Sequence, residues 1–180
     1  MIYKFRVILD AEDDVFRDIA IDETDTLEDL HNAIVNAFGF DGLEVGSFYT
    51  CDDTWNQEDE IPMFDAGDVP GENKIMSDYQ LSDILDKENT KIIYVYDFIN
   101  MWTFLVELAS IEGQETGVIY PNLLFSLGAM PAEAMEKHFQ ADFEEEENYN
   151  EFEDDLDEDD LDAFGSDDSF EDFGFEENWN

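Results

Sequence analysis

The sequence predicts an α+β fold in which one main helix packs across a mixed β-sheet, followed by a disordered acidic tail. Three observations lead to this prediction. Polar and apolar side chains alternate at the start of the chain, apolar side chains recur at helical spacing between positions 27 and 38, and residues 141–180 hold 20 acidic side chains without one Lys or Arg. A chain of about 140 residues can bury a real core. We therefore expect a folded domain over residues 1–140 and a tail over residues 141–180.

Two strands open the chain. In IYKFRVIL, apolar or aromatic side chains alternate from Tyr3 to Leu9, with Lys4 and Arg6 between them, which is the period of a β-strand. The cluster DAEDD that follows is typical of a turn. Because VFRDIAI then has the composition of a second strand, the opening segment predicts a hairpin.

The segment TDTLEDLHNAIVNAFG predicts the main helix. Thr26 can cap its first turn, and Asp29 three positions later completes a capping-box pattern. Gly39 suits the left-handed residue that ends a helix. The apolar residues at helical spacing are Leu27, Leu30, Ile34 and Phe38.

Further strands and a long loop fill the rest of the domain. LEVGSFYTC predicts a third strand, in which an internal glycine is typical of a bulge. Residues 52–75 are acidic and rich in Pro and Gly, which predicts a long loop. We expect a short helix at 79–85 and a short helix or turn at 132–139. KIIYVYDF and WTFLVEL predict a second hairpin. Two hairpins beside one helix resemble the β-grasp arrangement of ubiquitin-like folds.

The charge of the chain limits its partners. With 50 acidic and 7 basic side chains, the formal charge is −43. Nucleic acids and anionic membranes are disfavoured, because both are bound through Lys and Arg. Basic proteins or peptides are favoured, and weak binding of divalent cations is expected.

The sequence predicts a cytoplasmic location. Cys51 is the only cysteine, so no internal disulfide forms. The opening residues lack the pattern of a signal peptide, and no apolar run reaches the length of a membrane span.

No catalytic constellation is present. His31 and His138 are far apart in sequence and make no zinc pattern with Cys51. We expect His31 to be hydrogen-bonded near the core, Asp97 to cap a turn, and the Cys51 thiol to be unreactive beside acidic neighbours. The acidic run from Asp155 fails as a calcium loop, since Asp160 replaces the required glycine. The sequence therefore predicts no catalytic, cofactor-binding or metal-binding residue.

Aromatic side chains are unexpectedly frequent in the acidic tail. Residues 141–180 contain eight of them, whereas disordered acidic segments are usually poor in aromatic residues. Three interpretations stay open: the rings dock on another protein, they dock on the chain's own body, or they have no specific role. The hypothesis of a partner-binding segment rests on Phe164, Phe170, Phe173, Phe175 and Trp179.

Several motifs resemble one family. Phe16 and Arg17 form an aromatic-Arg pair, LEDLH opens the helix, GF ends it, and YDFINMW contains a Tyr-Asp-Phe and a Trp at matching positions. Over roughly residues 3–110, this combination is similar to the plasmid pRiA4b ORF-3-like family, also labelled an insertion-element passenger. The chain departs at Ile99, Asn100 and Phe104, where the family has Gly, Asp and His. The resemblance implies a fold more than a function, because the family has no well-established activity.

These observations predict a non-enzymatic interaction protein. It would hold a basic protein partner through acidic surfaces and tail aromatics, as an adaptor, as a chaperone for a nucleic-acid-binding protein, or as a mimic of nucleic-acid charge. The alternative is a hydrolase-like or metal-dependent enzyme with a carboxylate site near the 52–75 loop. A cluster of Asp52, Asp53, Asp59 and Asp97 would favour that alternative.

Overall fold

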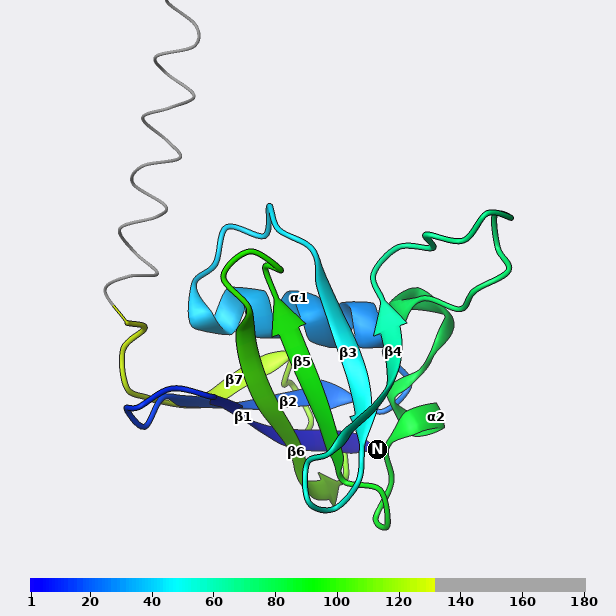
Figure 1. The fold of residues 1–180 in the computed structure, drawn as a ribbon. Helices are drawn as coiled ribbons and strands as arrows, with labels where there is room; N and C mark the ends of the chain where they lie inside the picture. The colour runs from blue at the N-terminus through cyan, green and yellow to red at the C-terminus, as the bar shows by residue number, and fades with distance from the viewer. Residues whose placement is uncertain (132–180) are drawn as a thin grey trace, which may run out of the picture. The chain divides into compact units, whose positions relative to one another are not determined.

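A single seven-stranded sheet forms the framework of the protein. The computed structural model describes residues 1–131, and the predictions for residues 132–180 lie outside this part of the chain. The main helix α1 lies across one face of the sheet (Figure 1), which confirms the α+β class. In chain order the elements are β1 (Ile2–Leu9), β2 (Phe16–Asp22), α1 (Leu27–Phe38), β3 (Gly46–Cys51), β4 (Gln57–Pro62), a 3₁₀ turn (Met76–Asp78), α2 (Leu81–Ile84), β5 (Lys91–Tyr96), β6 (Trp102–Glu112) and β7 (Asn122–Leu127).

The predicted mixed sheet is wrong, because every strand pairing in the described residues is antiparallel. The strand order is β4-β3-β5-β6-β1-β2-β7. A β-grasp arrangement needs a parallel strand beside β1. Here the strand beside β1 is β6, the second strand of the β5–β6 hairpin, and it is antiparallel to β1. The β-grasp assignment is therefore not confirmed.

Helix α1 has the boundaries that its capping residues predict. The Thr26 Oγ1 accepts a hydrogen bond from the Asp29 N–H at 3.2 Å, and the Asp29 carboxylate accepts one from the Thr26 N–H at 2.8 Å. Gly39 ends the helix with a left-handed φ of 80°. This reciprocal pair satisfies two N–H groups that a helix start leaves without partners.

Two strands are absent from the sequence-based prediction. Residues 52–75 are not one long loop, since Gln57–Pro62 form β4 and pair with β3. The Asp52 carboxylate closes the turn before β4 by accepting from the Thr54 and Asn56 N–H groups at 2.8 and 3.0 Å. Strand β7 lies between Pro121 and Gly128, in a segment for which no strand was predicted. It pairs with β2 at the far edge.

The core lies between α1 and the inner face of the sheet. Fully buried residues come from the helix and from strands β1, β2, β3, β5 and β6, and include Leu30, Ile34, Phe48, Tyr94 and Phe104. Burial of such side chains is the main favourable contribution to folding.

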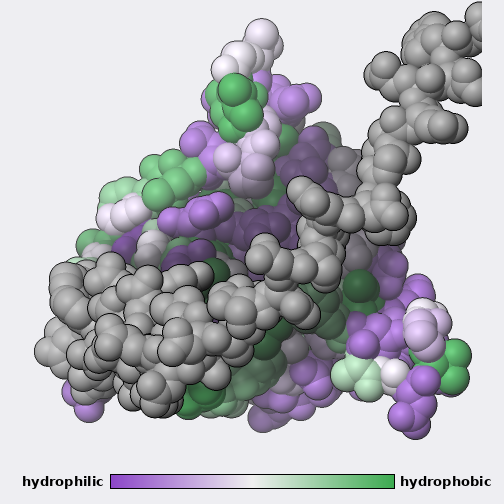
Figure 2. All heavy atoms as spheres, turned by 90° about the horizontal axis from the view of Figure 1, so that it is seen from above, coloured by the Kyte–Doolittle hydropathy of each residue, from purple (hydrophilic) through white to green (hydrophobic). Residues whose placement is uncertain are grey.

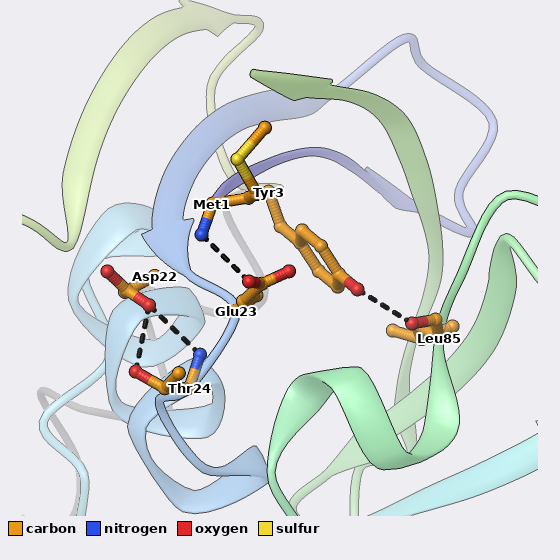
Figure 3. Close-up of polar contacts among 6 residues, drawn as sticks. All are labelled: Met1, Tyr3, Asp22, Glu23, Thr24 and Leu85. Carbon is orange, nitrogen blue, oxygen red and sulfur yellow. Dashed lines mark hydrogen bonds and ion pairs between the residues drawn. The ribbon is translucent and has the colours of Figure 1, made fainter. Parts of the chain in front are cut away.

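Polar contacts attach the start of β1 to its neighbours. The Met1 amino group lies 2.9 Å from the Glu23 carboxylate, and the Tyr3 hydroxyl donates to the Leu85 carbonyl oxygen at 3.0 Å (Figure 3). The second contact joins β1 to the residue that follows α2. No helix within residues 1–131 is long and apolar enough to cross a membrane.

Candidate functional site

The two edges of the sheet differ in their chemistry. At one edge, β4 has the sequence QEDEIP, with three consecutive acidic residues and a proline. At the other edge, β7 has the sequence NLLFSL and carries no charge. Charged side chains and proline are the usual means by which an edge strand avoids pairing with another chain. Of these two edge strands, β7 alone contains neither a charged side chain nor a proline.

Strand β7 also presents apolar side chains to solvent. Leu123, Leu124, Phe125 and Leu127 are between 41% and 50% exposed. The register with β2 shifts at Leu124, which has no partner residue across the pair. Such a bulge locally changes the twist of a strand. The result is an apolar edge that pairs with no second strand in the described residues.

Arg17 of β2 forms hydrogen bonds with both α1 and β7. Its Nε donates to the Ala37 carbonyl oxygen at 3.1 Å, and its Nη1 donates to the Leu127 carbonyl oxygen at 2.7 Å. The guanidinium also lies over the Phe38 ring, 4.8 Å from its centroid. Burial lowers the pKa of this side chain. Arg17, which the family resemblance singled out, therefore holds the last turn of α1 and the end of β7 in a fixed relation.

A groove of about 370 Å³ runs between α1 and the start of β7. One face of the helix supplies most of one wall, because its lining residues follow helical spacing. Ile19 of β2 is buried at the base. The lining residues are Ile19, Asp29, Asn32, Ala33, Asn36, Ala37, Pro121, Asn122 and Leu123.

The groove combines an apolar base with a polar, acidic rim. Ile19 is buried and the two alanines are half-buried, whereas Asp29, Asn32 and Asn36 are exposed. Within the described residues, both hydrogen bonds that the Asp29 carboxylate accepts from Thr26 go to Oδ2. The other carboxylate oxygen and the amides of the rim can therefore contact a ligand. No lining residue is basic.

The described part of the chain is strongly acidic as a whole, although the Arg17 guanidinium lies next to the groove, hydrogen-bonded to the Ala37 carbonyl oxygen. Residues 1–131 contain 28 acidic and six basic side chains. Two of the basic residues, Lys4 and Arg6, are paired with Glu112 and Asp18 at 2.6 and 2.8 Å. Where Figure 2 shows coloured atoms, hydrophilic residues alternate with separate hydrophobic patches. A field of this sign attracts cationic ligands.

His31 lies where the sequence predicted, hydrogen-bonded in the core. Its Nδ1 is 2.5 Å from the hydroxyl oxygen of Tyr94, and the His31 side chain is almost fully buried. Burial lowers the pKa of His31 and raises that of Tyr94. The pair is enclosed by packed rings and does not line the groove.

Asp97 caps the β5–β6 turn, as predicted. Its carboxylate accepts hydrogen bonds from the Ile99 and Asn100 N–H groups at 3.0 and 3.3 Å, and its φ is 59°. Its own N–H donates to the Val45 carbonyl oxygen at 2.9 Å, which joins this turn to the segment before β3. The two segments also carry exposed apolar side chains: Leu43, Val45, Phe98, Ile99 and Met101.

The carboxylates named for an enzyme site are not brought together. Gly46, the first residue of β3, pairs with Tyr96, so Asp97 lies beside the start of β3. Asp52 follows Cys51, the last residue of that strand. Asp97 lies opposite Val45, and the seven residue steps from there to Asp52 correspond to about 23 Å along the strand. The structure describes no group of three or more His, Cys, Asp or Glu residues within 1–131 that could share a metal ion. The pKa of the Cys51 thiol is raised, first by burial and then by Asp52.

The predicted partner-binding aromatics, from Phe164 to Trp179, lie outside the described residues. Sequence analysis missed the β7 edge, although a signal existed. The six residues between Pro121 and Gly128 include four large apolar side chains and no charge in an otherwise acidic chain. The flanking Pro121 and Gly128 are typical of a loop and hide this signal.

Within residues 1–131, the fold is an antiparallel α+β structure in which the uncharged edge strand β7 lies beside a groove with Asp29 on its rim. The chain belongs to the plasmid pRiA4b ORF-3-like family, whose model matches residues 1–171. This match confirms the resemblance drawn from Phe16, Arg17 and the helix motifs.

Comparison with solved structures gives the same fold. The crystal structure of the protein of unknown function MM3350 from Methanosarcina mazei Go1 is similar, with a TM-score of 0.63 and 25% sequence identity. The similarity covers 78% of this chain and 80% of that chain. No curated protein is significantly similar to the chain.

Proposed function

We propose that this protein is a non-enzymatic binding protein that holds a basic protein partner by adding an extended segment of that partner to the edge of β7. The contrast between the two sheet edges carries the proposal. β4 has three acidic residues that discourage pairing, whereas β7 exposes apolar side chains and has no charge. Strand addition gains affinity from main-chain hydrogen bonds and specificity from alternate side chains.

The acidic composition supports a basic partner. Steering by opposite charge raises association rates, and like-charged partners are repelled. The aromatic residues of the acidic tail, Phe164 to Trp179, would add apolar contacts to the same partner. Such a protein would act as an adaptor, as a chaperone for a nucleic-acid-binding protein, or as a mimic of nucleic-acid charge.

A defined peptide pair tests the strand-addition mode. The peptide KTVTKTVTK can form a strand, whereas KTPTKTPTK has the same charge but cannot donate the full set of main-chain hydrogen bonds. We expect the first to bind at least about tenfold more tightly in fluorescence anisotropy, since several main-chain hydrogen bonds distinguish the two. Equal affinities would mean that charge alone attracts the peptide and would overturn the proposal.

Two matched variants locate the binding edge. Leu124→Lys puts a charge on the unpaired bulge residue of β7, and Ile119→Lys makes the same charge change at a residue that is 86% exposed before the strand. We expect only Leu124→Lys to weaken binding of KTVTKTVTK clearly. If the two variants bind the peptide alike, β7 is not the edge that is used.

A further inference from the structure

We propose that the groove between α1 and β7 is a subsite for one basic side chain, Lys or Arg, of the added strand. This inference rests on the proposed function, because the groove is filled from a segment paired with β7. It goes further by assigning a specificity to one position of that segment. The proposal follows from the register of β7, from the lining of the groove and from its charge.

The register places one side chain of an added strand beside the groove. Arg17 and Ile19 lie on the face of β2 that looks toward α1, since Arg17 donates to the Ala37 carbonyl oxygen and Ile19 lines the groove. Leu123 of β7 is the partner of Ile19 and lines the same groove. Side chains alternate between the two faces of a strand, and neighbouring strands lie about 4.8 Å apart. A residue opposite Leu123 on an added strand would therefore point toward α1.

The lining suits a long side chain with an apolar stem and a cationic head. Ile19, Ala33 and Ala37 offer an apolar base for methylene groups. Lys and Arg regularly bury their stems in this way while the charge stays near water.

The rim suits the cationic head itself. Asp29 supplies a carboxylate, and Asn32 and Asn36 supply amide oxygens from the same helix face. Lys and Arg carry only donors, so each of these groups is a matching acceptor. An acidic side chain would meet the Asp29 carboxylate and the surplus of acids over the body, and would be repelled.

Asn36 allows a test that leaves the helix caps intact. It is exposed, and its side chain makes no hydrogen bond with the described residues. Asp29 is unsuitable for the test because it belongs to the capping box with Thr26. Asn36→Lys and Asn36→Asp change the charge of the rim in opposite directions at one position.

The test compares two peptides of identical composition. KTVTKTVTK and KTVKTTVTK contain the same residues, so their net charge is the same. They differ in the central lysine, which lies on opposite faces of the strand in the two peptides. We expect wild-type protein to prefer the first by about threefold to tenfold. Asn36→Lys should abolish most of this preference, and Asn36→Asp should increase it.

The outcomes separate this inference from the proposed function. If neither peptide binds better than KTPTKTPTK, strand addition fails and the subsite fails with it. If both peptides bind through β7 with equal affinity, and the Asn36 variants change their affinities equally, strand addition stands and the basic subsite is overturned. Circular dichroism of both variants confirms that the compared proteins are folded.

Discussion

At the scale of single residues, the sequence predicts roles better than partners. His31 is hydrogen-bonded in the core as expected, but its partner Tyr94 is 63 positions away. Only the strand order brings the two together. Gly46 shows the same limit. We expected a bulge, whereas the glycine is needed because a Cβ atom there would lie 2.8 Å from the Tyr94 hydroxyl oxygen and from the Val95 carbonyl oxygen.

The buried histidine predicts a pH dependence of stability. Because burial lowers its pKa in the folded state, the unfolded chain binds the proton first as pH falls below about 6.5. His31 therefore favours folding above that pH and loses this contribution below it. The free energy of unfolding should fall more steeply between pH 7.5 and 5.5 in the wild type than in His31→Gln. Denaturant titrations that give parallel curves would contradict this account and would mean that His31 keeps its ordinary pKa.

Gly46→Ala should destabilise the protein. The added methyl group meets the backbone of β5 as well as the Tyr94 side chain, so β3 must shift. We expect a loss of about 1–3 kcal/mol in the free energy of unfolding, as for other overpacked sites. Gly113→Ala is the control, because a Cβ atom there meets nothing within 4 Å. Equal stabilities of the two variants would show that β3 and β5 are not so closely packed.

At the scale of elements, α1 was predictable because its signals are local. Its cap, its apolar spacing and its final glycine all lie within 14 residues. Strand β4 was not predictable, since QEDEIP has the composition of a loop and becomes a strand through pairing with β3. Pairing partners distant in sequence decide such cases, and propensity is only a weak guide.

Leu30→Ala tests how far α1 depends on its packing. Leu30 is fully buried against the sheet, so we expect a loss of about 2–5 kcal/mol in the free energy of unfolding. Leu43→Ala is the matched change at a residue that is 82% exposed, and it should cost less than about 0.5 kcal/mol. A similar cost for both would mean that α1 is not held by this core.

At the scale of the whole molecule, charge determines how stability depends on salt, whereas sheet topology determines which elements form the candidate site. The α+β class followed from periodicity, but the antiparallel order did not, because no local signal tells which strand of the second hairpin lies beside β1. The candidate site could not be predicted from the sequence for the same reason. It depends on β7 and α1, which are separated by more than 80 residues and are both hydrogen-bonded to Arg17 of β2.

Salt should stabilise the folded protein. With 28 acidic and six basic side chains in residues 1–131, self-repulsion opposes the compact state. The Debye length falls from about 30 Å at 0.01 M to about 10 Å at 0.1 M ionic strength. We expect the melting temperature to rise by a few degrees over this range. A flat or falling curve in calorimetry would mean that ion pairs such as Lys4–Glu112 outweigh the repulsion.

Hydrogen exchange at β7 tests the central claim most directly. The amides of residues 122–127 are followed in the full chain, alone and with saturating KTVTKTVTK, with KTPTKTPTK as the peptide of equal charge. If the partner segment joins the sheet, amides of β7 should exchange more slowly only with the strand-forming peptide, while those of β4 stay unchanged. Binding of that peptide without added protection at β7, or with the same protection from the proline peptide, would contradict the account.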